Sequence, residues 1–597
     1  MINKIYKIMC VACATFTVTS CLDTVILPDN ITVGEDFWQR KSDVALMVNE
    51  AYNGMTVENV MERLIVWGDF RTDEVAAMAD GSLEGTIPEA LKELEQASTQ
   101  VTNRYATWSD FYSVINKCNI VLEKAASVMD ADPNYTEGDY LTDRSQMLAL
   151  RALCYFYLVR NFRDVPYVGE AYMSSSKERS FEQVAPTVVL QHCIDDLEEA
   201  AKNAIQARGY ASTDWRRVGW FTKDAINALL ADVYLWRASV LHSNADYQKA
   251  IDCCDQVIDS KKSMHVKGRT ETVEKEYPLA DARKSYEDIF VTQNAEESIF
   301  ELQVPQNPAM CKYLYKYGSN TSSEGYLKGS IIFTLDAATT NITGAVGEKV
   351  YPANDIRYYW TVFTPVSGAE SFNIRKLISN NSREVLTTEA RGFVSRDYAD
   401  IDQNYIIYRL SDVMLMKAEA MVQLVDTAMA GLSDEDRAAK QAQVDLGLRQ
   451  AFNLVQAVNT RALLDANLGD SIKWSNLTTM KRTGKDGMEL LVMEERLREL
   501  CFEGKRWYDL LRFNYRHIND ARYDQLICGA DLESLPANFD DMLAIMTRGR
   551  TKMANGLKAK VRNEAYLYLP IPNSDLILSP LMKQNPAYGS SNQFERQ

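Results

Sequence analysis

Two stretches of the sequence combine aromatic rings with charged or polar side chains at short spacing. A tyrosine or tryptophan ring offers a flat apolar face, while carboxylate and guanidinium groups beside it can hydrogen-bond to hydroxyl groups. The pattern is therefore typical of a surface that binds flat, polyhydroxylated ligands. The candidate residues are Trp67, Asp69, Arg71 and Asp73, with the loop 80–108 beside them, and in the second stretch Tyr313, Tyr315, Tyr317, Tyr326, Tyr358, Tyr359 and Trp360.

The sequence carries no motif of a common enzyme class. It lacks H-E-x-x-H, G-x-S-x-G, a Walker loop and a glycine-rich dinucleotide fingerprint. A carboxylate pair for glycoside hydrolysis carries no signal, because some neighbouring pair is inevitable among 82 acidic residues. We therefore predict that the protein is not an enzyme, with a glycoside hydrolase kept as an alternative.

Metal and cofactor sites are not indicated either. The four histidines are widely separated, and the cysteines beyond residue 21 lack the spacing of a zinc site or a disulfide framework. Most of these cysteines fall within helical apolar patterns, which predicts small buried side chains. The acidic segment LSDEDR at 432–437 lacks the residue order of a calcium loop and is interpreted as a helix cap. We predict no metal and no cofactor. Binding of calcium stays possible, although no motif indicates it.

The first 21 residues have the layout of an export signal. Lys4 and Lys7 precede the apolar run 8–18, and the sequence V-T-S-C ends the segment at Cys21. The apolar run is too short to span a bilayer. We predict a lipoprotein signal at 1–20, a lipid-modified Cys21 and a tether at 21–35. The alternative is cleavage to a soluble form in which Cys21 is an ordinary thiol.

Composition and charge exclude several classes of protein. The chain has 597 residues, 46% of them hydrophobic and 25% charged, as in an ordinary folded protein. Its formal net charge of −17 repels nucleic acid phosphates and anionic bilayers, so we predict no nucleic-acid partner.

The hydrophobic periodicity predicts a mainly helical fold. Apolar residues recur at helical spacing around 108–129, 143–162, 187–206, 222–241, 246–260, 405–425, 445–465 and 487–513. Three pairs among these segments are similar to tetratricopeptide units: 229–258, 147–159 with 188–201, and 408–424 with 444–458. We predict an all-α scaffold of stacked helix pairs, with a loop-rich insert where the helical period disappears. An ordinary helical hairpin stays possible for each pair.

Several segments in order resemble the SusD/RagB family of nutrient-binding lipoproteins. They include GDFRTDEV at 68–75, WSDFYSVINKCNIVLEKA at 108–125, RSQMLALRALCYFYLVRNFRDVPYV at 144–168 and MEERLRELCFEGKRWYDLLRF at 493–513. Arg163 stands where that family usually has glycine. The resemblance implies a SusD-like fold divided into a tetratricopeptide-containing part at 36–265, the insert at 266–400 as candidate ligand-binding face, and a C-terminal part at 401–597.

The resemblance also implies a function. A SusD-like lipoprotein in the outer membrane would capture a glycan at the cell surface and deliver it to a SusC-like TonB-dependent transporter. The two aromatic stretches would then be the glycan site, while capture of peptides is the alternative within the same fold. Trp108 and Tyr112 follow the helical pattern and are interpreted as core. The alternating charges of 495–512 are interpreted as an ion network on a helix surface.

Overall fold

The structure is a computed structural model, and it describes residues 37–76, 86–173, 180–265, 276–282, 284–304, 328–333, 350–351, 354–362, 372–376, 403–463, 471–476, 484–517, 545, 560 and 563–589. The predicted signal, Cys21 and the tether lie outside these residues. The division into three parts at 265 and 400 stays a prediction.

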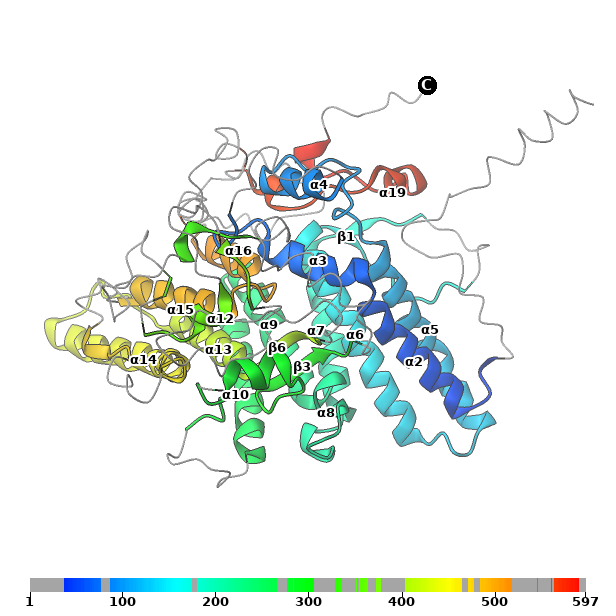
Figure 1. Ribbon diagram of the computed structural model, residues 1–597, viewed down its shortest axis with the longest axis horizontal. Coiled ribbons are helices and arrows are strands. Elements are labelled where there is room, and N and C mark those ends of the chain that lie inside the picture. Colours follow the sequence, from blue (N-terminus) through cyan, green and yellow to red (C-terminus); the bar gives the residue numbers. More distant parts are fainter. Residues whose placement is uncertain are drawn as a thin grey trace, which may run out of the picture.

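Helices dominate the described chain, as predicted (Figure 1). The helices of the first half are α2 (Lys41–Met55), α3 (Glu58–Asp69), α4 (Thr86–Glu95), α5 (Ser109–Ala131), α6 (Glu137–Phe162), α7 (Pro186–Asn203), α8 (Arg216–Gly219), α9 (Lys223–Leu241) and α10 (Asn244–Met264). Those of the second half are α12 (Arg357–Thr361), α13 (Leu410–Leu424), α14 (Asp434–Arg461), α15 (Gly484–Leu500), α16 (Arg506–Arg516) and α19 (Asn573–Leu578).

Consecutive long helices pack side by side across the molecule. The three helix pairs expected from the sequence, α6 with α7, α9 with α10 and α13 with α14, are each in contact. The contacts continue between the pairs, from α7 to α9 and from α10 to α13, so that the pairs stack into one array (Figure 1). This arrangement confirms the predicted all-α scaffold of tetratricopeptide-like units.

The turn between α9 and α10 shows how the sequence produces such a pair. His242 adopts a left-handed conformation with φ of 53°, which reverses the chain directly after α9. The side chain of Ser243 then accepts a hydrogen bond from the backbone N–H of Asp246 and caps α10. Because two residues suffice for the reversal, the helices must lie antiparallel.

Two sequence predictions of single helices are wrong in part. Residues 405–409 form a strand, β6 (Tyr405–Arg409), which pairs antiparallel with β3 (Ser298–Leu302) before α13 begins. The aromatic and β-branched run YIIY favours this extended pairing. The segment 487–513 is two helices, because the chain between α15 and α16 takes positive φ at Phe502 and Gly504. The other strands are short: β1 (Val165–Pro166) with β2 (Gln183–Val184), and β4 (Lys328–Gly329) with β5 (Phe372–Asn373).

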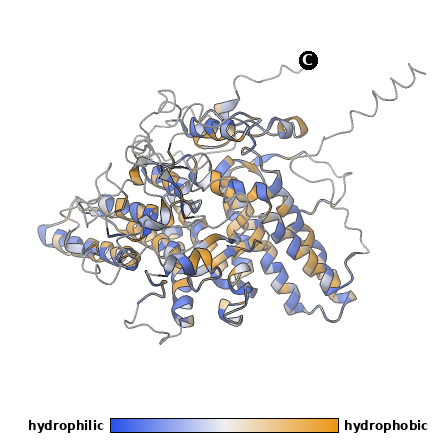
Figure 2. Ribbon diagram, in the orientation of Figure 1, coloured by the Kyte–Doolittle hydropathy of each residue, from blue (hydrophilic) through white to orange (hydrophobic). Residues whose placement is uncertain are grey.

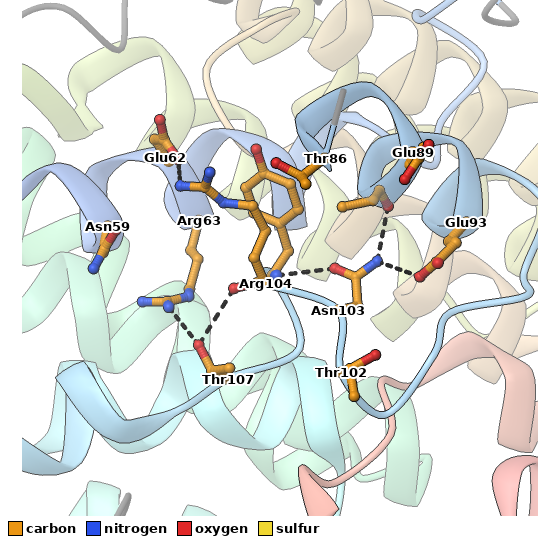
Figure 3. A pocket seen from close by; sticks show the side chains of 12 residues that line it. Asn59, Glu62, Arg63, Thr86, Glu89, Glu93, Thr102, Asn103, Arg104 and Thr107 are labelled. Atoms are coloured by element: carbon orange, nitrogen blue, oxygen red, sulfur yellow. Dashed lines mark hydrogen bonds and ion pairs between the residues drawn. The ribbon is translucent and has the colours of Figure 1, made fainter. Parts of the chain in front are cut away.

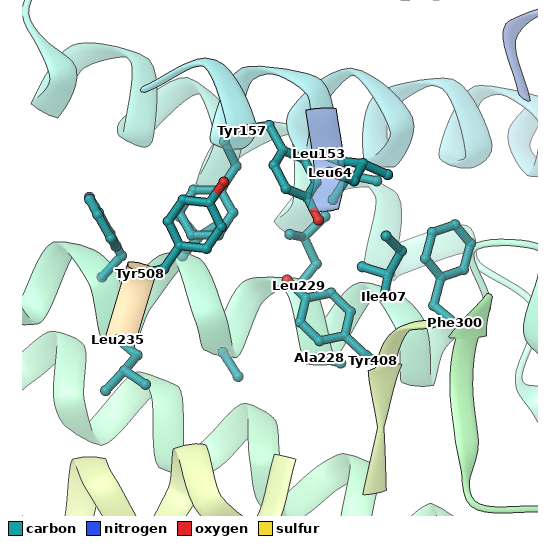
Figure 4. Packing of buried hydrophobic residues seen from close by; sticks show 14 of the residues in the cluster. Leu64, Leu153, Tyr157, Ala228, Leu229, Leu235, Phe300, Ile407, Tyr408 and Tyr508 are labelled. Atoms are coloured by element: carbon teal, nitrogen blue, oxygen red, sulfur yellow. The ribbon is translucent and has the colours of Figure 1, made fainter. Parts of the chain in front are cut away.

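The core joins segments that are far apart in the sequence. Figure 4 shows side chains of α3, α6, α9 and α16 packed together with those of β3 and β6. Orange and blue residues alternate along the helices in Figure 2, as amphipathic helices require. Trp108 and Tyr112 lie in this core, as predicted, and so do the described cysteines, which are Cys118, Cys154, Cys193, Cys253, Cys254 and Cys501.

The charged residues of α15 and its neighbours form an ion network, but the network is buried rather than open to solvent. Arg409 at the end of β6 contacts the carboxylates of Glu297, Glu499 and Glu503. Arg357 of α12 contacts Glu499 at 2.8 Å from another side. The predicted network on the helix surface is therefore present, but it is not open to solvent, because α12, β6 and α14 cover the charged face of α15.

The guanidinium groups keep the central carboxylate ionised. Burial alone would raise the pKa of Glu499, but Arg461, Arg409 and Arg357 together hold it well below its ordinary value. A second buried group continues the network on α16, where Arg512 contacts Glu419 of α13 at 2.8 Å and Asp509 at 2.6 Å.

Replacing Arg409 by methionine is expected to destabilise the fold by about 3–5 kcal/mol, because it leaves three buried carboxylates without their shared cation. The free energy of unfolding in urea measures this loss. The matched control is Arg144→Met, which removes the partly exposed pair of Arg144 with Glu199 and should cost about 0–1 kcal/mol. Equal losses in the two variants would contradict a central role of the buried network.

Gly68→Ala tests the contact of α3 with the α15–α16 turn. A Cβ atom at Gly68 would lie 2.2 Å from the carbonyl oxygen of Gly504, so one of the two backbones must move. We expect a loss of about 3 kcal/mol in unfolding free energy, at the upper end of overpacking costs. Gly138→Ala is the control, because its nearest neighbour is 3.8 Å away. An unchanged urea midpoint for Gly68→Ala would refute the close contact.

Candidate functional site

The first predicted aromatic stretch is buried instead of forming a surface platform. Trp67 is 1% exposed, stacks on Phe111 with ring centroids 5.1 Å apart and donates from Nε1 to the carbonyl oxygen of Tyr105 at 2.8 Å. Its ring is therefore part of the core between α3 and α5. A ligand on the surface does not reach it.

The charged residues of that stretch tie α3 to the C-terminal half of the chain. Asp69 accepts a hydrogen bond from the Gly504 N–H at 3.0 Å, and Asp73 forms a two-pronged ion pair with Arg506 at 2.8 and 3.0 Å. Arg71 donates to the Leu567 carbonyl oxygen at 2.8 Å. All three side chains are buried and bond to distant parts of the chain, which corrects their assignment as exposed ligand contacts.

The described residues of the second stretch are also packed inside. Tyr358 and Trp360 of α12 are buried, and Tyr359 is half-buried. Trp360 lies 6.0 Å from the ring of Tyr286 in a small separate cluster. Tyr313, Tyr315, Tyr317 and Tyr326 lie outside the described residues, so their role stays a prediction.

An open pocket lies beside the first stretch, between α3, α4 and the loop that leads into α5 (Figure 3). Its volume is about 590 Å³, within the range of ligand pockets. The lining residues are Asn59, Glu62, Arg63, Thr86, Glu89, Ala90, Glu93, Thr102, Asn103, Arg104, Tyr105 and Thr107. Residues of the segment 86–107 thus supply much of the wall. The expectation of a loop over 80–108 is wrong in part, because residues 86–95 form α4.

Two arginines fix the floor of the pocket. Arg104 donates to the buried carboxylate of Glu62 at 3.0 Å, and its guanidinium lies over the Tyr105 ring at 5.4 Å. Arg63 bonds to Thr107 and Asp110, which joins α3 to the start of α5. Because each guanidinium is held by a carboxylate, its remaining N–H groups are oriented before any ligand arrives.

Asn103 fixes the opposite wall. Its side-chain N–H group donates to the Ala90 carbonyl oxygen at 2.9 Å and to Glu93 at 2.7 Å, while its Oδ1 accepts from the Tyr105 N–H (Figure 3). The loop is thereby fastened to α4. The lining residues of the pocket that are exposed to solvent are Asn59, Thr86, Glu89, Thr102 and Arg104.

The pocket therefore presents an amide, hydroxyls, a carboxylate and a guanidinium at a solvent-open rim. These groups include both donors and acceptors of hydrogen bonds, which suits a polyhydroxylated ligand. Among the described lining residues Tyr105 is the aromatic one, and it is buried. The described lining thus offers a ligand hydrogen-bonding groups and no exposed aromatic platform.

The sequence analysis missed the polar residues of this pocket. Asn59, Glu62 and Arg63 stand within an amphipathic helix pattern, where charged residues ordinarily face solvent. Asn103 and Arg104 stand in a loop without any motif. A clue was the run Thr102, Asn103 and Arg104, a few residues before the aromatic helix start at Trp108.

In the part of the chain that the structure describes, no three His, Cys, Asp or Glu residues come together as a metal site. None of the described helices combines the length and the hydropathy that a bilayer-spanning segment requires.

Stacked helix pairs with an open polar pocket define a helical binding protein. Comparison with known sequences identifies its family. The model of the SusD family matches residues 270–588, and a second model, described as starch-binding and associating with the outer membrane, matches residues 36–235. The chain belongs to the SusD family, a family of glycan-binding proteins.

Relatives of known sequence match nearly end to end. SusD-like protein P2 of Formosa agariphila is 23% identical over 609 residues, covering 98% of this chain and 100% of the relative. SusD-like protein P38 of the same organism is 23% identical over 519 residues, covering 82% of this chain and 86% of the relative.

Solved structures show the same fold. A SusD homolog from Bacteroides thetaiotaomicron superposes with a TM-score of 0.60 at 18% identity, covering 92% of this chain and 98% of the other. A laminarin-binding SusD-like protein superposes with a TM-score of 0.58 at 19% identity, covering 92% and 100%. Arg163 takes a positive φ of 65°. Glycine adopts such a backbone conformation readily, which explains the glycine expected at this position from the family resemblance.

The first stretch also contains a buried carboxyl pair, Asp69 and Glu74. Described residues supply no N–H or O–H donor to Asp69 Oδ1 or to either oxygen of Glu74. Burial raises the pKa of both groups, that of Asp69 to about 7. A proton shared between the two carboxyl groups is then retained near neutral pH.

This pair predicts a pH dependence of stability. The folded state holds the proton more tightly than the unfolded chain, so the pair's contribution is present below about pH 4 and is lost as the pH rises towards 7. In Glu74→Gln the fall in unfolding free energy between pH 5 and pH 8 should be smaller, because the amide donates to Asp69 without titrating. Urea unfolding at both pH values measures it, with the exposed Glu123→Gln as control. The same slope in wild type and Glu74→Gln would count against a shared proton.

Proposed function

We propose that this protein captures an oligo- or polysaccharide at the cell surface in the α3–α4 pocket and delivers it to a SusC-like TonB-dependent transporter. The observation that carries the proposal is the open pocket of about 590 Å³, whose exposed rim bears an amide, hydroxyl groups, a carboxylate and a guanidinium. Sugars present hydroxyl groups that both donate and accept hydrogen bonds, so they match a rim of mixed donors and acceptors.

The arrangement of the pocket suits binding of an exposed part of a long chain. The rim is open to solvent, and the groups behind it are held by protein partners, such as Glu62 by Arg104 and Asn103 by Glu93. A fixed frame lowers the ordering cost of binding, which otherwise consumes much of the gain from a few hydrogen bonds.

The family supports a glycan as ligand. One of the two matching models is described as starch-binding, and a laminarin-binding protein shares the fold. Both ligands named there are polysaccharides. We extend this class of ligand to the present chain, without a choice of sugar or linkage.

Attachment to the outer membrane is supported by the predicted lipid on Cys21 and by the family model's described association with that membrane. Without Lys4 and Lys7 of the predicted signal the net charge is −19, which gives no attraction to anionic lipid, so the lipid chain would hold the protein to the surface. We propose that the protein acts as a binding protein, without catalysis, and passes its ligand to the transporter.

The test is affinity electrophoresis of the chain from Leu22 through gels that contain plant, fungal or host polysaccharides. We expect one polysaccharide to retard the protein, and the double variant Asn59→Ala/Glu89→Ala to bind it at least about tenfold more weakly, since two hydrogen-bonding groups are lost. Both side chains are exposed, so the thermal midpoint should not change.

Arg449→Ala on the exposed side of α14 is the matched control and should leave retardation unchanged. Retardation that survives the pocket variant would place the glycan elsewhere. A protein that no polysaccharide retards, but that binds peptides, would overturn the proposed function, and shortened sugar products would indicate a hydrolase instead.

A further inference from the structure

One tryptophan of this protein is exposed, at a place remote from the pocket. All nine tryptophans lie in the described part of the chain; Trp215 has 45% of its surface exposed, while the others are buried or half-buried. It directly precedes the short helix α8, which Figure 1 places on the opposite side of the molecule from α4. A large exposed ring in a protein that covers its other tryptophans points to contact with something outside the chain.

The ring of Trp215 is held in place from behind. A Cβ atom at Gly219 would lie 2.7 Å from Trp215 Cε3, which shows that the indole lies against the backbone of this glycine. The helix itself packs on β3, and Arg217 donates to the Asn294 carbonyl oxygen at 3.1 Å. One side of the indole is thus fixed on the scaffold, which leaves its exposed part to solvent.

Polar groups in fixed positions adjoin this ring. Trp220 stands at 86° to Trp215 with centroids 6.4 Å apart, and Arg216 lies over the rings of Trp220 and Tyr210 at 5.9 and 5.2 Å. Arg216 donates from Nε and Nη2 to Asp214 at 3.0 and 2.6 Å. Its side chain is 44% exposed, and Nη1 takes no part in these bonds.

We propose that Trp215 and Trp220, with Asp214 and Arg216, form a second site that binds a pyranose ring of a glycan. The C–H face of the sugar would lie on the exposed indole, and its hydroxyl groups would meet the oriented guanidinium and carboxylate. The inference shares the ligand class of the proposed function but does not depend on the α3–α4 pocket.

The chemistry of the surroundings favours a sugar over a protein partner. The neighbours Ser212 and Thr213 are exposed and polar, and of the three aromatic rings only that of Trp215 is exposed, since Tyr210 and Trp220 are half-buried. A stable protein interface needs a larger apolar centre than this patch supplies. A second sugar contact far from the first would let one long polysaccharide, or two chains, bind with increased avidity.

The test uses the chain from Leu22 with the pocket disabled by Asn59→Ala/Glu89→Ala. In this background the polysaccharide panel should still protect tryptophan fluorescence from acrylamide quenching, and adding Trp215→Ala should remove the protection. In the chain with an intact pocket, Trp215→Ala should weaken polysaccharide binding about tenfold, whereas Trp215→Phe, which keeps a ring, should weaken it less.

Leu446→Ala, which removes another exposed apolar side chain on α14, is the control and should change neither signal. Gly219→Ala keeps all four side chains but displaces the indole, so it should weaken binding without loss of the aromatic ring.

If pocket variants abolish binding while Trp215→Ala changes nothing, the second site is overturned and the proposed function stands. If Trp215→Ala alone abolishes binding, the second site stands and the pocket is refuted. If no polysaccharide protects the tryptophan fluorescence from quenching, the second site is overturned.

Discussion

The buried ion network around α15 is the constraint on which the rest of the structure depends. Removing a charged group from water costs several kcal/mol, and the guanidinium groups of this network offset that cost through contacts with carboxylates. Those carboxylates come from distant parts of the chain: Glu297 precedes β3, Glu499 lies at the end of α15, and Glu503 lies in the turn that follows α15. Arg409 can meet all three only when β3, β6 and α15 are assembled together. The network thus favours one arrangement of these segments over looser apolar packings.

The same region positions the proposed ligand pocket. The turn after α15 brings Gly504 against Gly68, and Arg506 then reaches Asp73. These contacts fix the C-terminal end of α3 in the centre of the molecule. The preceding turns of α3 carry Glu62 and Arg63, which hold the pocket loop and the start of α5. The buried ionic centre and the exposed binding rim are therefore joined through one helix.

The distribution of side chains explains how such a protein could hold a polysaccharide without strong aromatic stacking in its pocket. Most tryptophans serve the core, where their large rings fill the spaces between helix pairs. The pocket is left with hydrogen-bonding groups in fixed positions, and the exposed indole at α8 stands apart from it. Two modest contacts on opposite sides of a rigid scaffold suit a long, repetitive ligand better than a short one.

The sequence by itself determined the helical scaffold, because a 3.6-residue apolar period marks each long helix whatever its neighbours are. It also determined that Trp108 and Tyr112 belong to the core. The order of its motifs along the chain determined the family. Periodicity could not show that 405–409 is a strand, since pairing with β3 depends on a segment a hundred residues earlier. Nor could residue types show that Asp69 is buried: its partner, the Gly504 N–H, is 435 positions away in the chain. Charged and aromatic residues at short spacing look alike in a surface site and in a buried junction, and only the tertiary contacts decide which of the two they form.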